Sequence, residues 1–349
     1  MQKSIMTKKL IVLLVVITML FSITACSKTD GEAETIELSL AHFFPATHPA
    51  ETVFVQGWIK AIDEATNGVV KITSYPGGTL LQAADTYNGV VEGVADIGLS
   101  CFSYTRGRFP VLEAFELPGI TYKNSKVASK VAWDGIQQLN PAEVQDTKLM
   151  MVIATGPGDL FTKDPIRSLA DLKGYEIRAT GLSATTIEAL GGIPIGMPQS
   201  DAYEALSKGI VKGNLSPVEV LKGWKHAEVT DYLTLTPFLY NTLFFVTMNS
   251  DKWASIPADL QKIILETTDK FYNETGIGLW DMQNEEGMDY AVNEQGMEVI
   301  ELSDAEKALW IEKVAPIQDT YTQSVKDLTS GTDVLKLVKE LADKYNGIY

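Results

Sequence analysis

The fold is decided by residues 36–99, where short apolar segments alternate with segments of helical pattern. The apolar segments are, in order, IELSLA (36–41), VVKITSY (69–75) and ADIGL (95–99). Their length and residue types predict strands. Residues 52–66 have apolar residues near helical spacing, and residues 83–92 form a second predicted helix that Gly93 closes. This order predicts a mostly parallel sheet with helices on both faces, whose ligands bind beyond the carboxyl ends of the strands.

The same alternation starts again after residue 148, which predicts a second lobe. Further strands are expected at residues 149–155, 175–179, 210–215 and 243–248, and further helices at residues 183–190 and 200–208. The break Gly156-Pro157-Gly158 is a suitable place for the chain to cross between lobes. The strand at residues 243–248 is expected to run back into the first lobe.

We therefore predict an α/β fold of two hinged lobes, each a mostly parallel sheet flanked by helices, with a small-molecule cleft between them. A length of 349 residues also favours two lobes over one core. The expected boundaries are residues 36–155 plus 244–283 for the first lobe and residues 156–243 plus 284–349 for the second. The helical pattern from Asp259 to about Asn293 predicts a long helix that spans both lobes.

Composition and motifs exclude several classes of function. The chain has 29 Lys plus Arg against 45 Asp plus Glu, a net charge of −16, and such a surface repels nucleic-acid phosphates. His42, His48, His226 and the two cysteines have no metal-ligand spacing, so we expect no metal and no cofactor. Nucleotide-binding, zinc-protease and serine-hydrolase motifs are absent from the sequence. We expect that the protein is not an enzyme, with catalysis through His42 or His48 as the less favoured alternative.

The first 35 residues indicate the compartment. Three lysines precede the apolar run LIVLLVVITMLF (10–21), which has the length of a signal-peptide core. The following Ile23-Thr24-Ala25-Cys26 resembles a bacterial lipobox. The resemblance implies a signal peptide at residues 1–25, lipidation of Cys26, a linker at residues 26–35 and a location on the extracytoplasmic face of the bacterial cell membrane. The alternatives are an uncleaved anchor helix and a soluble secreted form.

Residues 171–181, DLKGYEIRATG, resemble the solute-binding proteins of tripartite ATP-independent periplasmic (TRAP) transporters, the DctP-like family, whose pattern there is D-L-K-G-x-x-I-R. Further matches in the family's order are TNG (66–68), YPGG (75–78), GVADI (93–97), FP (109–110), LP (117–118), GGIP (191–194), YEALSKG (203–209), G-x-x-x-P (213–217), MN (248–249) and WASIP (253–257). Each motif is weak alone, but together they cover nearly the whole mature chain in the right order. The resemblance implies a periplasmic-binding-protein-like fold.

By its position in the I-R motif, Arg178 is expected to pair with a carboxylate of the ligand, as the resemblance implies. A guanidinium presents a planar fork that matches a carboxylate, and the next helix offers free N–H groups nearby. The alternative from the residues alone is an internal ion pair with an Asp or Glu. Some relatives carry a second pocket arginine, but Asp159 lies near that position here, so clamping by two arginines is not expected.

The other candidate ligand-binding residues are polar groups near helix starts and aromatic residues near strand ends. They are Gln199, Ser216, Glu219, Phe43, Phe44, Phe102, Trp224 and Asn241. Ser216 stands where many relatives have asparagine, and with Glu219 it also fits a capping box, so helix capping is its favoured role, ligand contact is the alternative, and the two roles are compatible. The number of aromatic residues suggests an apolar or aromatic acid.

We thus expect an extracytoplasmic binding protein that captures a small organic acid by hinge closure and delivers it to a TRAP-type permease. A sensory subunit that presents its closed form to a signalling receptor is the alternative.

Overall fold

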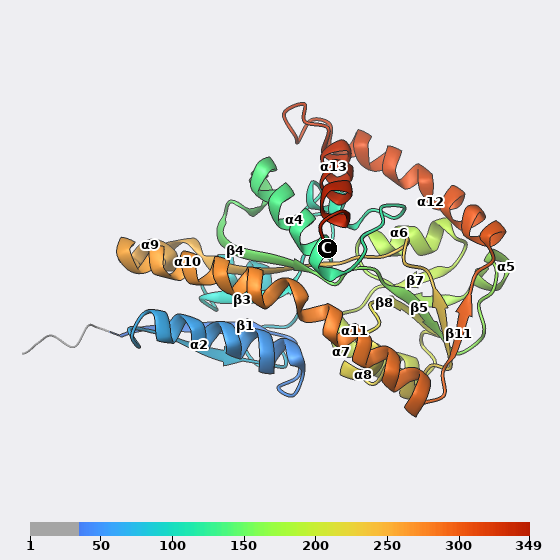
Figure 1. Cartoon of the computed structure of the whole chain (residues 1–349), viewed down its shortest axis with the longest axis horizontal. Helices are drawn as coiled ribbons and strands as arrows, with labels where there is room; N and C mark the ends of the chain where they lie inside the picture. The colour runs from blue at the N-terminus through green and yellow to red at the C-terminus, as the bar shows by residue number, and fades with distance from the viewer. Residues whose placement is uncertain (1–34) are drawn as a thin grey trace, which may run out of the picture. The chain divides into compact units, whose positions relative to one another are not determined.

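The computed structural model describes residues 35–349, and its elements form two mixed sheets flanked by helices (Figure 1). Except for the first residue of β1, these elements belong to one compact unit, Glu37–Tyr349. The predicted α/β class and two-lobed fold are confirmed. Within residues 35–349, each helix is too short or too polar to cross a membrane.

The first sheet has the strand order β2-β1-β3-β10-β4. Its strands are β1 (Ile36–His42), β2 (Val70–Tyr75), β3 (Ile97–Cys101), β4 (Thr147–Ala154) and β10 (Leu243–Asn249). β1 and β3 pair in parallel, whereas β10 is antiparallel to both β3 and β4. The strand predicted to run back from the second lobe therefore lies inside the first sheet.

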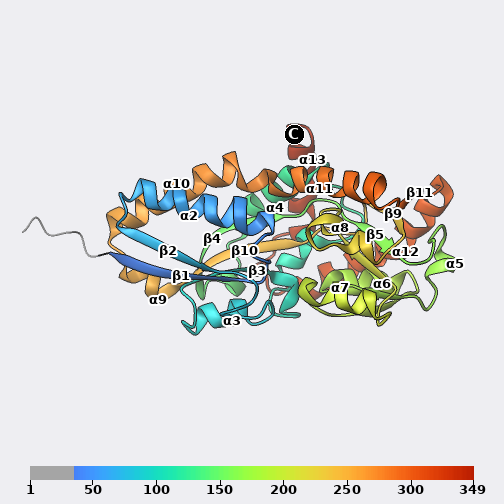
Figure 2. The same ribbon diagram turned by 90° about the horizontal axis from the view of Figure 1, so that it is seen from below.

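Helices cover both faces of the first sheet (Figure 2). The helices of this lobe are α2 (Gln56–Ala65), which follows a π-helical turn (Ala50–Val55), α3 (Thr86–Val91), α4 (Ser125–Leu139), α9 (Ser250–Ser255) and α10 (Ala258–Glu274). α2 and α10 pack together on one face, where Trp58 Nε1 donates to Thr268 Oγ1 over 2.9 Å, and α3 lies on the other face. α4, which we did not predict, packs on β4 and is capped by Asn124, whose side chain accepts from Val127 N.

The second sheet has the order β11-β9-β5-β8-β6-β7. Its strands are β5 (Asp159–Thr162), β6 (Glu176–Arg178), β7 (Ile193–Ile195), β8 (Gly213–Ser216), β9 (Tyr232–Leu235) and β11 (Glu298–Glu301). The helices around it are α5 (Leu169–Leu172), α6 (Leu182–Ala189), α7 (Gln199–Ser207), α8 (Val220–Gly223) and α12 (Asp304–Val325). β6, β7 and β8 run in parallel, and β5 is antiparallel to its neighbours β8 and β9.

Two segments cross between the sheets beside each other, one from β4 to β5 and one from β9 to β10. Thr155 N donates to Thr242 O over 3.1 Å, and Gly158 N donates to Tyr240 O over 3.1 Å. Gly156 has a φ of +72°, and a Cβ there would lie 2.7 Å from Ser125 N, so glycine is required at this crossing. The first crossing lies at the Gly-Pro-Gly break that the sequence indicates.

The predicted long helix is a helical run with an interruption. α10 is followed by a 3-10 turn (Gly276–Gly278), α11 (Leu279–Asp289) and a π-helical turn (Tyr290–Glu294). α10 contacts α2 and β4 in the first lobe, and α11 contacts both α4 in the first lobe and α8 in the second, so the run spans both lobes as predicted. Thr275, with φ −126° and ψ −49°, leaves helical geometry before the two glycines and breaks the run.

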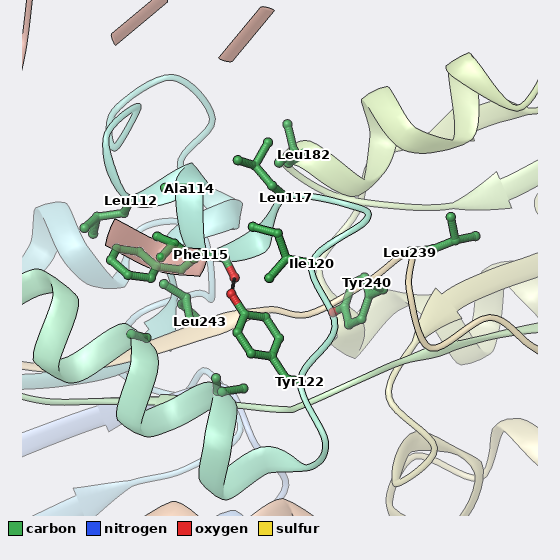
Figure 3. Packing of buried hydrophobic residues seen from close by; sticks show 14 of the residues in the cluster. Leu112, Ala114, Phe115, Leu117, Ile120, Tyr122, Leu182, Leu239, Tyr240 and Leu243 are labelled. Atoms are coloured by element: carbon green, nitrogen blue, oxygen red, sulfur yellow. Dashed lines mark hydrogen bonds between the residues drawn. The ribbon is translucent and has the colours of Figure 1, made fainter. Parts of the chain in front are cut away.

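The last helix, α13 (Val334–Asn346), packs on α4 and on the 3-10 turn Leu112–Glu116. The lobe boundaries drawn from the sequence stay a prediction, and these contacts favour grouping α13 with the first lobe. Figure 3 shows the apolar cluster at this junction, which brings Phe115 and Tyr122 together with Leu182 of α6 and with Leu239 and Tyr240 of the second crossing. The cluster packs the two lobes together where the chain crosses.

Candidate functional site

A narrow cavity lies where the ends of strands from both sheets meet. Seven of the predicted ligand-binding residues line it: Phe43, Phe44, Arg178, Gln199, Ser216, Glu219 and Trp224. The other lining residues are Cys101, Ser103, Tyr104, Thr155, Thr180, Pro217, Val220, Tyr240, Thr242 and Phe244. Many of these residues end or follow β1, β3, β4, β6 and β8, at the carboxyl ends where parallel sheets bind ligands.

Arg178 is the last residue of β6 and is only 2% exposed. Its Nε donates to Met197 O over 3.0 Å. Its terminal nitrogens make longer contacts, 3.3 Å to Ser216 Oγ, 3.5 Å to Asn214 Oδ1 and 3.4 Å to the Tyr104 hydroxyl. Within residues 35–349, Arg178 has no salt bridge to an Asp or Glu side chain. The internal ion pair that was the alternative for Arg178 is therefore not formed in the described part of the chain.

The positive charge of Arg178 is thus buried among neutral oxygens. Removing a cation from water costs several kcal/mol, and neutral acceptors at 3.3–3.5 Å offset only part of that cost. An anion in the cavity would offset more of it, because Coulomb attraction is strong where water is excluded. The geometry therefore suits an anionic ligand placed between Arg178 and the first lobe.

Ser216 ends β8 and does not cap a helix. α8 begins at Val220, its N-cap residue is Glu219, and no side chain caps it. The Ser216 hydroxyl instead donates to Asn214 Oδ1 over 3.0 Å and accepts from Arg178. The predicted capping box is wrong, because the Ser216 hydroxyl forms hydrogen bonds with Arg178 and Asn214 and not with a helix N-terminus.

The start of α7 also differs from the expected helix at residues 200–208. α7 begins at Gln199 after Pro198, and the Ser200 hydroxyl donates to Asp201 instead of capping the helix. The fixed φ of Pro198 starts the helix one residue earlier than expected.

Gln199, the first residue of α7, connects the cavity to a buried histidine. Its side-chain amide lies 2.9 Å from His226 Nε2, and its backbone N donates to the Tyr104 hydroxyl over 3.0 Å. The other ring nitrogen of His226, Nδ1, lies 3.1 Å from Asn214 Nδ2. Burial, together with the charge of Arg178, lowers the pKa of His226 to about 3, so this imidazole is neutral at neutral pH.

Glu219 and His48 form a buried pair across the two lobes. His48 Nδ1 accepts from Ala50 N over 3.0 Å, so its Nε2 carries the proton and donates to Glu219 Oε2 over 3.2 Å. Glu219 and His48 are 4% and 2% exposed. A Cβ on Gly223 would lie 2.7 Å from His48 Nε2 and 2.8 Å from Glu219 Oε2, so glycine at this position makes room for the pair.

Aromatic rings form one wall of the cavity. Phe43 stacks on Phe44 with ring centroids 4.4 Å apart, and on Trp224 of the second lobe at 6.0 Å with an interplanar angle of 22°. Phe43 also meets Tyr104 edge-on at 5.5 Å and lies 6.4 Å from Phe244. Such a wall offers flat apolar surface on which an aromatic or branched apolar group can pack.

Two predicted residues lie elsewhere. Phe102 packs against Phe109 and Phe245 at ring distances of 4.8 and 5.0 Å, and lines a different pocket. The Asn241 side chain donates to Phe115 O over 2.9 Å beside the hydrophobic cluster at the junction.

Several lining residues were not among the predicted site residues. Tyr104, two positions after Phe102, contacts Arg178, and burial raises the pKa of its hydroxyl well above the usual value. The sequence signal was its place just after β3, which we used for Phe102. Cys101, Thr155 and Thr242 carry no motif, and only the folded chain brings them to the cavity.

The His42 cluster lacks the geometry of a nucleophile activated by a base. His42 Nε2 lies 2.8 Å from Glu51 Oε2 and 3.2 Å from Ser74 Oγ, so the acid and the hydroxyl share one ring nitrogen. A catalytic triad places them on opposite nitrogens. Burial lowers the pKa of His42 despite the neighbouring Glu51 carboxylate.

The predicted signal peptide, the predicted lipidation site Cys26 and residues 26–34 of the predicted linker lie outside the described residues. Within residues 35–349, no cluster of His, Cys, Asp or Glu side chains is arranged to hold a metal ion.

Residues 40–324 match the family model of bacterial extracellular solute-binding proteins, family 7. The 2,3-diketo-L-gulonate-binding periplasmic protein YiaO of Escherichia coli is 26% identical over 290 residues, which cover 80% of this chain and 84% of that protein.

Two solved TRAP solute-binding proteins are similar in structure. One from Desulfovibrio salexigens, in an open complex, has a TM-score of 0.75 and 34% identity, and the match covers 90% of this chain and 98% of that one. A marine metagenome protein specific for aromatic acid ligands, in complex with metahydroxyphenylacetate, has a TM-score of 0.83 and 28% identity, with coverage of 89% and 99%.

Proposed function

The chain belongs to family 7 of the bacterial extracellular solute-binding proteins, and from this premise we propose that it captures a small organic acid in the cavity between its lobes. The observation that carries the proposal is Arg178, which is buried, faces the cavity and has no carboxylate partner within residues 35–349. A ligand carboxylate would accept from its terminal nitrogens, whose present contacts are long.

Capture would proceed by closure of the lobes around the acid. The contacts that bridge the cavity pair Tyr104 with Arg178, Tyr104 with Gln199 and His48 with Glu219, each pair joining the first lobe to the second. A ligand held by both lobes shifts the open and closed populations toward the closed form by its differential affinity. The two hydrogen-bonded crossings are the candidate hinge.

The aromatic wall of the cavity supports a proposal for the chemical class of the acid. Phe43, Phe44 and Trp224 offer stacked rings, and the charged side chains among the lining residues are Arg178 and Glu219. We propose an aromatic or branched apolar monocarboxylate in preference to a polyhydroxylated acid. The marine protein specific for aromatic acid ligands supports this choice by analogy.

Delivery would be to a TRAP-type permease driven by an ion gradient, at the extracytoplasmic face of the membrane. Lipidation at Cys26 would keep the protein beside that partner. Mass analysis of the membrane-bound protein would show a diacylglyceryl-modified Cys26, and Cys26→Ala would release the protein from the membrane. A wild-type protein that stays unmodified would overturn the anchor and leave the binding proposal intact.

The binding proposal is tested by titration calorimetry of wild-type protein against benzoate, mandelate, succinate and gluconate. We expect binding of the aromatic acids, and Arg178→Ala should weaken it about tenfold to a hundredfold, as for a buried charge that loses its partner. Arg167→Ala is the matched control, because Arg167 is exposed and pairs with Glu298 on the surface. Equal affinity of wild type and Arg178→Ala would overturn the role of Arg178.

A further inference from the structure

A chain of buried polar side chains connects Arg178 to Gln199 through residues that do not line the cavity. Asn214 and His226 are each 0% exposed and lie behind the lining residues. The contacts run from Arg178 Nη1 to Asn214, from Asn214 to His226 Nδ1 at 3.1 Å, and from His226 Nε2 to the Gln199 amide at 2.9 Å. Each of these side chains has a known number of hydrogen-bond donors and acceptors. The direction of every hydrogen bond between them can therefore be worked out in order, starting from Arg178.

The starting point is Arg178, because a guanidinium only donates. The Asn214 atom that faces Arg178 Nη1 at 3.5 Å and the Ser216 hydroxyl at 3.0 Å must therefore be the amide oxygen. The amide nitrogen of Asn214 then points at His226 and donates to Nδ1. Nδ1 of His226 is consequently an acceptor and carries no proton.

The charge of the His226 imidazole decides where its proton lies. His226 is neutral at neutral pH because burial and the nearby guanidinium lower its pKa. A neutral imidazole has one proton, and with Nδ1 unprotonated that proton is on Nε2. The Gln199 atom 2.9 Å from Nε2 must then accept a hydrogen bond, so it is the amide oxygen.

The two ends of a side-chain amide have the same shape, so the donors and acceptors around them decide which end is which. With the Gln199 oxygen on His226, the NH₂ group takes the position 3.4 Å from Ser216 Oγ, at the cavity. Ser216 Oγ then accepts hydrogen bonds from Gln199 and Arg178, and its hydroxyl donates to Asn214 Oδ1. In this arrangement every donor among these side chains faces an acceptor. With the Gln199 amide turned the other way, its NH₂ group and the Nε2–H group of His226 would face each other, and both are donors.

We propose that His226 is a positioning residue that, as its Nε2–H tautomer, turns the NH₂ group of Gln199 toward the cavity as a second donor for the ligand carboxylate. This inference deepens the proposed function and rests on it for the role of the carboxylate. The carboxylate would receive hydrogen bonds from Arg178 and Gln199, both anchored from behind by Asn214 and His226. Ligands whose group at this position can donate only would be rejected, because Arg178 and Gln199 both donate.

The first experiment needs no ligand. Nitrogen NMR of uniformly ¹⁵N-labelled full chain, with the three histidines assigned through His42→Gln, His48→Gln and His226→Gln, reports which nitrogen of each ring carries the proton. We expect His226 to be the Nε2–H tautomer at pH 7. We also expect a coupling across the hydrogen bond between Asn214 Nδ2 and His226 Nδ1, and none between Gln199 Nε2 and His226. A proton on Nδ1, an imidazolium, or a coupling to Gln199 Nε2 would overturn the inference.

The second experiment measures benzoate binding by calorimetry. Gln199→Glu replaces the donor by an acceptor opposite the anion and should weaken binding about a hundredfold, whereas Gln199→Ala only deletes the donor and should cost about tenfold. Gln138→Glu, on an exposed position of α4, adds the same charge away from the cavity and is the control. A change of less than threefold in Gln199→Glu would contradict the donor role.

The two readouts separate the inference from the proposed function. Absence of benzoate binding by wild type with the expected tautomer would count against the choice of ligand and leave the orientation of Gln199 standing. Benzoate binding with the opposite tautomer would support the proposed function and overturn the role of His226. The variant His226→Leu lacks the acceptor for Asn214 and the donor to Gln199. It should bind benzoate severalfold more weakly than wild type, and its thermal unfolding should remain cooperative, which shows that the variant is folded.

Discussion

Replacing Arg178 by methionine should make the protein without ligand more stable while it removes binding. The side chain of Arg178 is buried, and of its four hydrogen bonds only that to Met197 O is as short as 3.0 Å. Methionine has similar length and no charge, and its flexible thioether side chain adapts to irregular apolar gaps. Within residues 35–349 the Arg178 guanidinium has no carboxylate partner, so its burial carries a desolvation cost that methionine would not have.

The magnitude follows from two opposing contributions. Replacing buried ionic groups by apolar residues of similar volume is often stabilising by about 1–4 kcal/mol. Loss of the donor to Met197 O costs about 1 kcal/mol, and Asn214 Oδ1 keeps the Ser216 hydroxyl. We therefore expect the free energy of unfolding of Arg178→Met to exceed that of wild type by roughly 1–2 kcal/mol.

The assay is urea unfolding of dialysed protein, with benzoate absent and then present. Ligand stabilises only the native state that binds it, so benzoate should raise the midpoint of wild type and leave that of Arg178→Met unchanged. Arg108→Met is the control, because Arg108 pairs with Asp146 and lies 4.7 Å over the ring of Tyr87. This control should lose about 1 kcal/mol. A loss above about 2 kcal/mol in Arg178→Met would mean that the guanidinium is internally satisfied, since removing one partner of a buried pair is strongly destabilising.

Three other substitutions have defined outcomes. Gly223→Ala places a Cβ within 2.8 Å of both members of the His48–Glu219 pair and should displace them. The benzoate affinity measured by calorimetry should then fall about tenfold, and an unchanged affinity would show that the pair is not needed for closure. Burial raises the pKa of Glu116 to about 8, above its unfolded value, so its protonated form stabilises the fold at low pH and this contribution is lost as pH rises toward 8. Glu116→Gln should reduce the decline of the free energy of unfolding between about pH 5 and 8. One such group contributes a slope of at most about 1.4 kcal/mol per pH unit, and an unaltered slope would contradict the raised pKa of Glu116. Trp224→Ala removes the stacking partner of Phe43 and should weaken benzoate binding about tenfold while succinate binding changes little; an equal effect on both acids would remove the aromatic wall as a specificity element.

The elements that position the site were largely readable from the sequence. Alternation of short apolar segments with helices predicted β1, β3, β6 and β8, and the carboxyl ends of these strands supply much of the cavity lining. The family motif placed Arg178 at the end of a strand, where the structure also has it. Local pattern suffices for such features because strand ends and glycine turns are set by neighbouring residues.

The rest of the site depends on contacts between residues far apart in the sequence. Tyr104 and Arg178 are 74 residues apart, and His48 and Glu219 are 171 apart, so no local pattern pairs them. Ser216 fits a capping box by spacing alone, but its hydroxyl is taken by Arg178 and Asn214. A lone histidine such as His226 gives no signal until the fold encloses it with two amides.

We propose above all that Arg178, which has no carboxylate partner within residues 35–349, is neutralised by an incoming acid. The most direct test is a crystal structure of the full extracytoplasmic chain grown with benzoate. The account predicts that both carboxylate oxygens lie within hydrogen-bond distance of the Arg178 guanidinium, with the ring against Phe43 and Trp224. A structure in which an Asp or Glu side chain of the protein forms an ion pair with Arg178, or in which the benzoate carboxylate binds away from Arg178, would contradict the account.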